Sequence, residues 1–344
     1  MGSRREGLFP LIGEGIFCQD GDAWKHSRAL LRKQFARLEY SDLTTFEEHV
    51  EALIQRFASV DGIVDLQPAF FDFTLATTTA LLFGEAVDTL GTTKRAEFSD
   101  HFDHGTFVCA MRLRLADLCW LYTPAAFRES CRVVKKFAGH FVQQALVCQK
   151  TQGPDRAFEH YPFILDLYDS VQDSELVRDQ LVNVLLAGRD TTACSMSWAF
   201  FLLVRHPDIL QRLKTEIFEV TQGNIQITKQ HIRQMPYLKA VWDETLRLYP
   251  QIPVNVRISN KATYLPRGGG PDGMSPVLVH KGTGVGVSVY HMRRSKTLFG
   301  EDVQAFRPER WLTGELDKIG WGYMPFHNGP RICLGSKFES LPAS

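Results

Sequence analysis

Apolar residues recur at three- and four-residue spacing along most of the first 250 residues, which is the period of a helix with one buried face. Few stretches in this part of the chain alternate apolar and polar residues as strands do. The pattern predicts helices over 22–38, 41–59, 68–82, 93–115, 125–150, 161–170, 207–221 and 237–248. This part of the chain is therefore expected to be mostly helical.

A longer helix is expected over 173–205, where the runs LVNVLLAG and SMSWAFFLLV place apolar residues on several faces. A helix that is apolar all round is usually buried inside a protein. Arg189 and Asp190 interrupt the apolar stretch and Pro207 follows it, so a buried helix is favoured over a membrane span. The N-terminal stretch also lacks the apolar core of a signal peptide. We therefore expect no transmembrane segment in this chain.

After Pro250 the pattern changes to short β-prone pieces, namely VNVRIS, VLVHKG and GVGVSVYHM. The Gly- and Pro-rich stretch PRGGGPDG between them is expected to be a turn. Residues 306–335 have no clear period and are expected to form an ordered loop, a common place for functional residues. With no repeat and no low-complexity linker, we expect a single domain over 1–344, mainly α with a small β-sheet region (α+β).

Composition narrows the functional classes. A hydrophobic content of 44%, a charged content of 23% and a formal net charge of zero are typical of a globular protein. No basic tract points to a nucleic acid partner. The seven cysteines are scattered and form no CxxC pair, so a reducing compartment is the default expectation.

The segment FHNGPRICLG, at 326–335, places one cysteine after a glycine-containing loop and just before a point where a helix could begin. A helix N-terminus stabilises a cysteine as the thiolate, and an axial thiolate donates electron density to haem iron. The alternative is an ordinary buried cysteine. The pattern F-x-x-G-x-R-x-C-x-G fixes five positions at once and favours the iron ligand. Its members are Phe326, which would shield the sulfur, Gly329, Arg331, which suits a haem propionate, Cys333 and Gly335.

Two further motifs contain polar residues inside predicted helices. AGRDTT lies in the middle of the long helix, where Asp and Thr compete for backbone hydrogen bonds, and such broken local rules often mark functional sites. A satisfied polar patch is the alternative. In ETLR, Glu244 and Arg247 share one helix face and can pair, although such pairs are common and contribute little on a surface.

These motifs, and their order along the chain, resemble those of cytochromes P-450. The pattern F-x-x-G-x-R-x-C-x-G is the haem-binding signature of that family. The resemblance covers nearly the whole chain. It implies the cytochrome P-450 fold and a haem (heme, iron protoporphyrin) whose axial ligand is Cys333. It also implies that Ala187 and Gly188 let a helix backbone lie close over the haem. Thr191 and Asp190 would relay protons to dioxygen.

The resemblance implies roles for six more residues. The E-x-x-R pair would be buried and joined by Arg310 of FRPERW in a network that locks the fold. Trp24 and Arg28 match a W-x-x-x-R motif that meets a haem propionate, and one helical turn separates them. Arg257, seven residues beyond LRLYP, would bind another propionate.

The activity implied is the insertion of one atom of dioxygen into a C–H bond of a hydrophobic substrate. The fuller pattern looks most like fungal enzymes that hydroxylate alkanes and fatty acids at or near the chain end. Electrons would come from an NADPH-dependent flavoprotein reductase, because the chain contains no dinucleotide-binding fingerprint. The family also implies the cytoplasmic face of the endoplasmic reticulum membrane, with membrane association only for the full-length form.

Two alternatives stay open. One is a tailoring hydroxylase of fungal secondary metabolism, since the apolar segments expected to select substrate, 98–115, 176–184 and 252–256, fit either ligand. The other is a non-catalytic fragment. Compared with the family pattern, the chain is expected to be an incomplete catalytic domain, truncated at both ends. It would lack the N-terminal anchor, the first sheet strands and the C-terminal hairpin.

Overall fold

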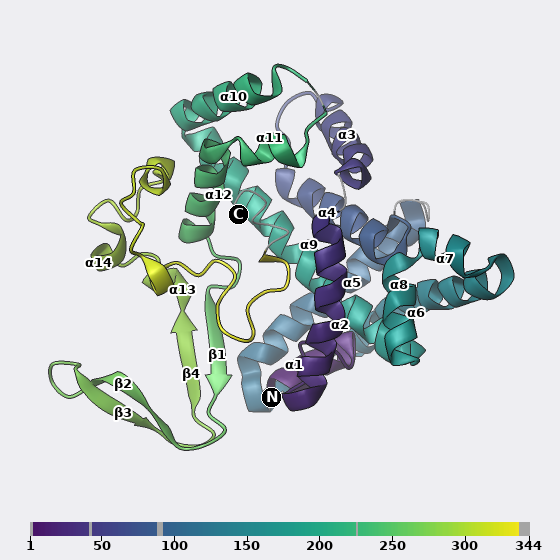
Figure 1. The fold of residues 1–344 in the computed structure, drawn as a ribbon. Coiled ribbons are helices and arrows are strands. Elements are labelled where there is room, and N and C mark those ends of the chain that lie inside the picture. Colours follow the sequence, from purple (N-terminus) through teal and green to yellow (C-terminus); the bar gives the residue numbers. More distant parts are fainter. Residues whose placement is uncertain (1–2, 41–42, 88–91, 225, 337–344) are drawn as a thin grey trace. The chain divides into compact units, whose positions relative to one another are not determined.

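The computed structural model describes residues 3–40, 43–87, 92–224 and 226–336. Helices dominate these ranges, and short antiparallel strands follow residue 250, as Figure 1 shows. The expected mainly α, α+β class is therefore confirmed. None of the helices in these ranges combines the length and apolar character that a bilayer span requires.

The chain divides into two compact units. Unit 1 consists of Met1–Ser197, Asn224–Arg233 and Leu334–Ser344, and unit 2 of Trp198–Gly223 and Gln234–Cys333. Compact packing units do not by themselves decide how many domains a chain has. The single domain over 1–344 therefore stays a prediction.

Unit 1 is helical in its described parts. The longer helices agree with the predicted ranges to within a few residues, as expected where helix ends fray. Three helices were not predicted. Helices α7 and α11 are too short to show a helical period. Helix α1 has 10 residues, but its apolar residues cluster around Pro10 near its end and form no periodic face. The elements are α1 (Ser3–Ile12), α2 (Gly21–Tyr40), α3 (Thr44–Ala58), α4 (Leu66–Phe83), α5 (Thr92–Leu115), η2 (Ala116–Leu121), α6 (Ala125–Gln152), α7 (Pro154–His160), α8 (Pro162–Val171), α9 (Ser174–Arg205) and α11 (Lys229–Arg233), with α9 entering unit 2 at Trp198.

The core of unit 1 contains stacked aromatic rings from α4, α5 and α6. Phe83 stacks on Phe141 with 5.0 Å between ring centroids, and Phe98 stacks on Phe137 at 3.9 Å. Large rings that bury their faces contribute strongly to a core. Phe98, which opens one segment expected to select substrate, is thus a core residue of unit 1.

The first half of α9 carries buried polar side chains as well as the expected apolar ones. Asp179 and Asn183 accept hydrogen bonds from the backbone N–H groups of Glu14, at 2.8 Å, and Phe17, at 3.1 Å. The Asn183 side-chain NH₂ also donates to the Ile12 carbonyl at 2.9 Å. These contacts satisfy backbone groups of the loop between α1 and α2, which has no ladder partner of its own.

Unit 2 combines short helices with two antiparallel strand pairs, β1 with β4 and β2 with β3. Strand β2 was not predicted, because its last residues are the PRGG of the stretch expected to be a turn. The turn itself is confined to Gly270–Gly273, where both end glycines have positive φ. The elements are α10 (Pro207–Thr221), α12 (Pro236–Leu248), β1 (Val254–Ile258), β2 (Thr263–Gly269), β3 (Ser275–Val279), β4 (Gly284–Ser288), α13 (Val289–Met292), α14 (Lys296–Phe299), η3 (Pro308–Trp311) and η4 (Gly320–Gly322).

The stretch GVGVSVYHM also differs from the prediction, because only its first half is a strand. Ser288 ends β4 and accepts a hydrogen bond from the His291 N–H, so it caps the short helix α13. Serine favours this position because its side chain replaces a missing helical acceptor.

We expect Asn183→Leu to lower the free energy of unfolding by about 1–3 kcal/mol, because it removes the hydrogen-bond partner of the buried Ile12 carbonyl and of the partly buried Phe17 N–H. Urea denaturation followed by circular dichroism measures the change. Asn260→Leu, at an exposed position, is the control and should have little effect. Equal stability of the two variants would show that the loop does not depend on Asn183.

Candidate functional site

The residues expected to form the site fall in both units, and each group is described within its own unit. Unit 1 contains Trp24, Arg28, Ala187, Gly188, Asp190, Thr191 and Gly335, and unit 2 contains Glu244, Arg247, Arg257, Arg310, Phe326, Gly329, Arg331 and Cys333.

The cysteine loop of unit 2 is closed by its own backbone. The Cys333 N–H donates to the Phe326 carbonyl at 3.0 Å, and the Ile332 N–H donates to the Gly329 carbonyl at 3.1 Å. Gly329 has a φ of 77°, a left-handed conformation that glycine adopts without strain. The first glycine of the signature is thus required by backbone conformation, and the loop holds Cys333 at its end.

The helix expected directly after the cysteine begins slightly later. Gly335 lies in a turn, and helical backbone starts at Ser336, beyond which the residues lie outside the described ranges. Phe326 and Arg331 are half-buried, and Cys333 is exposed.

Burial separates Cys333 from other cysteines of the chain. Cys18, Cys109 and Cys131 are buried in the core of unit 1. Burial raises the pKa of these thiols to about 11, 12 and 11, respectively. A thiol that resists ionisation is a poor metal ligand, because the ligand is the thiolate. Cys333 is instead exposed at the end of its loop, so its thiol can reach a bound group, and its donor chemistry fits a haem iron.

Strand β1 is joined to the cysteine loop by a residue that the sequence interpretation overlooked. The Asn255 side-chain nitrogen lies 3.1 Å from His327 Nε2, and His327 has a φ of 59°. Asn255 Oδ1 also accepts from Arg257 Nη1 at 2.8 Å. Asn255 therefore links the exposed Arg257 to the loop. An asparagine two residues before a candidate propionate-binding arginine was its signal in the sequence.

In unit 1, Trp24 and Arg28 lie together on α2, as their spacing predicts. The Arg28 guanidinium is 5.7 Å from the centre of the Trp24 ring, a cation–π distance, and both side chains are half-buried. One helical turn thus brings a ring and a fixed positive charge to the same edge of the helix.

The AGRDTT motif lies in the part of α9 that belongs to unit 1. Thr191 Oγ1 donates to the Ala187 carbonyl at 2.6 Å, a common arrangement for threonine within a helix. A side chain at Gly188 would contact Thr78 Cγ2 of α4 at 3.3 Å. Within unit 1 the close approach at this glycine is therefore to α4, and its expected role beside haem stays a prediction.

Asp190 is half-buried and paired. Its Oδ1 accepts from Arg189 Nη1 at 3.1 Å. Burial raises the pKa of Asp190, and the positive charge of Arg189 offsets part of this rise. A carboxyl group with a raised pKa exchanges protons closer to neutral pH than an ordinary aspartate does.

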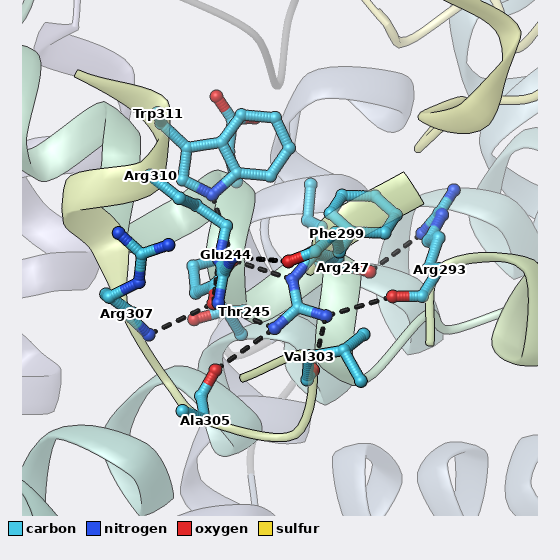
Figure 2. Close-up of polar contacts among 12 residues, drawn as sticks. Glu244, Thr245, Arg247, Arg293, Phe299, Val303, Ala305, Arg307, Arg310 and Trp311 are labelled. Carbon is cyan, nitrogen blue, oxygen red and sulfur yellow. Dashed lines mark hydrogen bonds and ion pairs between the residues drawn. The ribbon is translucent and has the colours of Figure 1, made fainter. Parts of the chain in front are cut away.

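In unit 2, the Glu244 carboxylate is the centre of a buried network, which Figure 2 shows. Arg247 donates to both of its oxygens at 2.8 Å, and Arg310 Nε donates to Oε1 at 3.0 Å. The Trp311 indole N–H and the Arg307 backbone N–H also donate to it, each at 3.0 Å. The structure thus brings the three expected residues together and adds two donors from η3 and the residue before it.

Other N–H groups of Arg247 and Arg310 donate hydrogen bonds to backbone carbonyls. Arg247 reaches the carbonyls of Arg293, Val303 and Ala305 at 2.9, 2.8 and 3.1 Å, respectively. Arg310 reaches that of Phe299 at 3.1 Å. A guanidinium has five donors in a fixed plane, so it can satisfy several carbonyls of an irregular segment at once.

Arg293, which the sequence interpretation did not select, extends this network toward the cysteine loop. Its guanidinium donates to the carbonyls of Leu246, at 2.7 Å, and Met324. The Met324 carbonyl also accepts the His327 N–H at 3.2 Å. Burial lowers the pKa of Arg293 to about 10, so the group stays positively charged at neutral pH. A charged residue directly after a β-prone segment was its only signal in the sequence.

Across the part of the chain that the structure describes, no three His, Cys, Asp or Glu side chains cluster as metal ligands. A model of the cytochrome P-450 family matches residues 6–340. The chain belongs to the cytochrome P-450 family. This confirms the resemblance seen in the motifs and with it the expected cytochrome P-450 fold.

Relatives of this cytochrome P-450 come from several fungi. Cytochrome P-450 52A5 of Candida maltosa is 42% identical over 362 residues, which cover 100% of this chain and 68% of the relative. A cytochrome P-450 of Arthroderma benhamiae is 43% identical, and the match covers 96% of this chain and 68% of the relative. Cytochrome P-450 monooxygenase g430 of Fusarium sp is 41% identical, and the match covers 99% of this chain and 64% of the relative. The chain thus spans about two thirds of these relatives.

Membership of the family makes this protein a haem-dependent monooxygenase of hydrophobic substrates. Haem is its cofactor, and dioxygen, the substrate and a redox partner are the other participants. The expected enzyme class and cofactor are therefore confirmed.

For this cytochrome P-450 we expect Glu244→Gln to lower the free energy of unfolding by about 3–5 kcal/mol, because two buried guanidinium groups lose their shared counter-charge. Chemical denaturation of the haem-loaded protein measures the loss. Arg307→Ala is the control, because only the backbone of Arg307 contacts Glu244. Its side chain forms partly exposed ion pairs, so its removal should cost at most about 1 kcal/mol. Similar losses in both variants would contradict a central role for Glu244.

Proposed function

We propose that this cytochrome P-450 hydroxylates fatty acids or alkanes and that Cys333 is the axial thiolate ligand of its haem. The cysteine loop carries this proposal, because it holds an exposed thiol at the end of a backbone-closed turn. The bound haem would supply the activation of dioxygen, with one oxygen atom entering a substrate C–H bond and the other leaving as water.

The substrate class rests on the sequence pattern and on the source of the relatives. The order and content of the motifs resemble fungal enzymes that hydroxylate alkanes and fatty acids, and the relatives from Candida, Arthroderma and Fusarium are fungal. An unbranched apolar chain buries its surface in an apolar pocket with no need for many polar partners. If the substrate is a secondary metabolite instead, titration with an unbranched fatty acid or alkane should leave the haem spectrum unchanged.

Basic residues would hold the haem propionates. Arg331 lies in the cysteine loop, and Arg257 is tied to that loop through Asn255. Arg28 presents its charge beside the Trp24 ring. Guanidinium groups suit this task because they form two parallel hydrogen bonds with a carboxylate.

Asp190 and Thr191 would move protons to dioxygen. Burial raises the pKa of Asp190, so this carboxyl group holds a proton more readily than an ordinary aspartate does, which suits a proton relay. The Thr191 hydroxyl, which donates to the Ala187 carbonyl, could turn to a water or an oxygen atom without breaking a backbone bond of the helix.

Electrons would come from an NADPH-dependent flavoprotein reductase, since the chain has no dinucleotide-binding fingerprint of its own. We place the enzyme at the cytoplasmic face of the endoplasmic reticulum membrane, on the strength of the family resemblance.

We expect Cys333→Ala to abolish the thiolate spectrum of the reduced, carbon monoxide-bound protein, because the other cysteines cannot replace the ligand. Cys148→Ala, at a half-buried position of α6, is the control and should keep the parent spectrum. Titration with dodecanoic acid and dodecane, followed as the haem spectrum changes, then tests the substrate class. A thiolate spectrum in Cys333→Ala, or no response to either ligand, would refute the respective part of the proposal.

We expect Thr191→Ala to uncouple the enzyme, because a proton donor beside bound dioxygen is lost while the iron ligand stays in place. NADPH consumption should continue with more peroxide and less hydroxylated product. Thr191→Ser, which keeps the hydroxyl, should restore most of the product. Unchanged product per NADPH in Thr191→Ala would exclude the relay role.

A further inference from the structure

Arg189 is a buried cation inside the AGRDTT motif, and its aromatic and carboxylate partners lie with it in unit 1. Its side chain is 1% exposed. The guanidinium lies 5.0 Å from the ring centre of Phe71 on α4 and 5.2 Å from that of Phe102 on α5. Two aromatic rings thus hold the group in one place, and cation–π attraction favours the charge between them.

Two carboxylates on different helices share one nitrogen of this cation. Arg189 Nη1 donates to Asp103 Oδ1 on α5 and to Asp190 Oδ1 on α9, the latter at 3.1 Å. A buried guanidinium is costly unless it is paired. Within the described ranges, Arg189 Nε is buried without a hydrogen-bond partner, so the two carboxylates provide most of the compensation.

We propose that Arg189 is a positioning residue that holds the Asp190 carboxylate for proton transfer and links it to α5 through Asp103. The inference rests on the proton-relay role proposed for Asp190. Arg189 itself transfers no proton. It fixes one oxygen of Asp190 and so limits the rotation of a side chain that is 33% exposed.

The charge balance at Asp190 supports this link. The charged groups that face Asp190 are Arg189 on its own helix and Asp103 on α5. Burial raises the pKa of Asp190, the charge of Arg189 lowers it and that of Asp103 raises it. A displacement of Asp103 therefore changes both the position and the proton affinity of the acid. Because α5 contains a segment expected to select substrate, binding there would reach the acid through this pair.

The test measures hydroxylated product per NADPH with dodecanoic acid as substrate. Arg189→Met should lower this ratio on the order of tenfold, less than the loss of a group that itself transfers protons. Arg189→Lys keeps the charge but loses the planar fork, so its ratio should be intermediate. Asp103→Asn should lower the ratio and Asp103→Glu should restore it. Asp100→Asn, an exposed carboxylate on the same helix, is the control.

A double-variant comparison separates positioning from general packing. Asp103→Asn and Asp190→Asn should together lose less than the product of their separate losses, because both act through one cation. In the Arg189→Met background the effect of Asp103→Asn should disappear. Independent, multiplying losses, or a normal ratio in Arg189→Met, would overturn the proposal.

Hydrogen exchange provides a readout that needs no substrate. Backbone amides of α5 around Asp103 should exchange several-fold faster in Arg189→Met and in Asp103→Asn than in Asp100→Asn, because a tie between α5 and α9 is lost. Unchanged exchange in both variants would also overturn the proposal. If the parent enzyme does not hydroxylate dodecanoic acid, the proposed substrate fails, whereas hydrogen exchange still decides the role of Arg189.

Discussion

The hydrogen bonds and ion pairs made to the Glu244 carboxylate are the interactions on which the segment between α14 and the cysteine loop depends. Five donors meet the carboxylate, and they come from α12, from η3 and from the residue before η3. In the described stretch between α14 and the cysteine loop, the only regular elements are the short 3-10 helices η3 and η4. Strand pairing and long helices therefore cannot provide the hydrogen bonds that the backbone N–H and C=O groups of this segment need. Arginine side chains form these hydrogen bonds instead, and the buried negative charge of Glu244 holds Arg247 and Arg310 in place.

The same solution recurs along the chain with other buried arginines. Arg112 donates to the carbonyls of Glu6, Cys119 and Tyr122, so it joins α1 to the end of η2 and the residues beyond. Arg293 does this for α12 and the segment before the cysteine loop. A flat group with five donors reaches several carbonyls where backbone geometry is irregular, and lysine offers no such fork. These arginines thus hold irregular segments in place, and Arg293 does so for the segment that leads into the cysteine loop.

Much of the secondary structure could be predicted, because an amphipathic helix of three or more turns repeats its pattern often enough to be recognised. The helices over residues 125–150 and 207–221 are such cases. Helix α7 and strand β2 were missed for a local reason: the first has 7 residues, and the second ends in glycines that also suit a turn. Asn255, Arg189 and Arg293 were missed because their importance lies in partners far along the chain.

The sequence by itself determined the family and the cofactor, and it predicted the residues that would carry the chemistry, because these depend on which side chains stand at fixed spacings within short motifs. Tertiary structure alone decided which partners those residues have. Glu244 and Arg247 would look the same on a surface helix, where such a pair contributes little. Their burial, and the 63-residue separation between Glu244 and the Arg307 N–H that binds it, result from packing between distant segments. Local pattern does not encode such contacts, because their free energy exists only once the chain has brought the segments together.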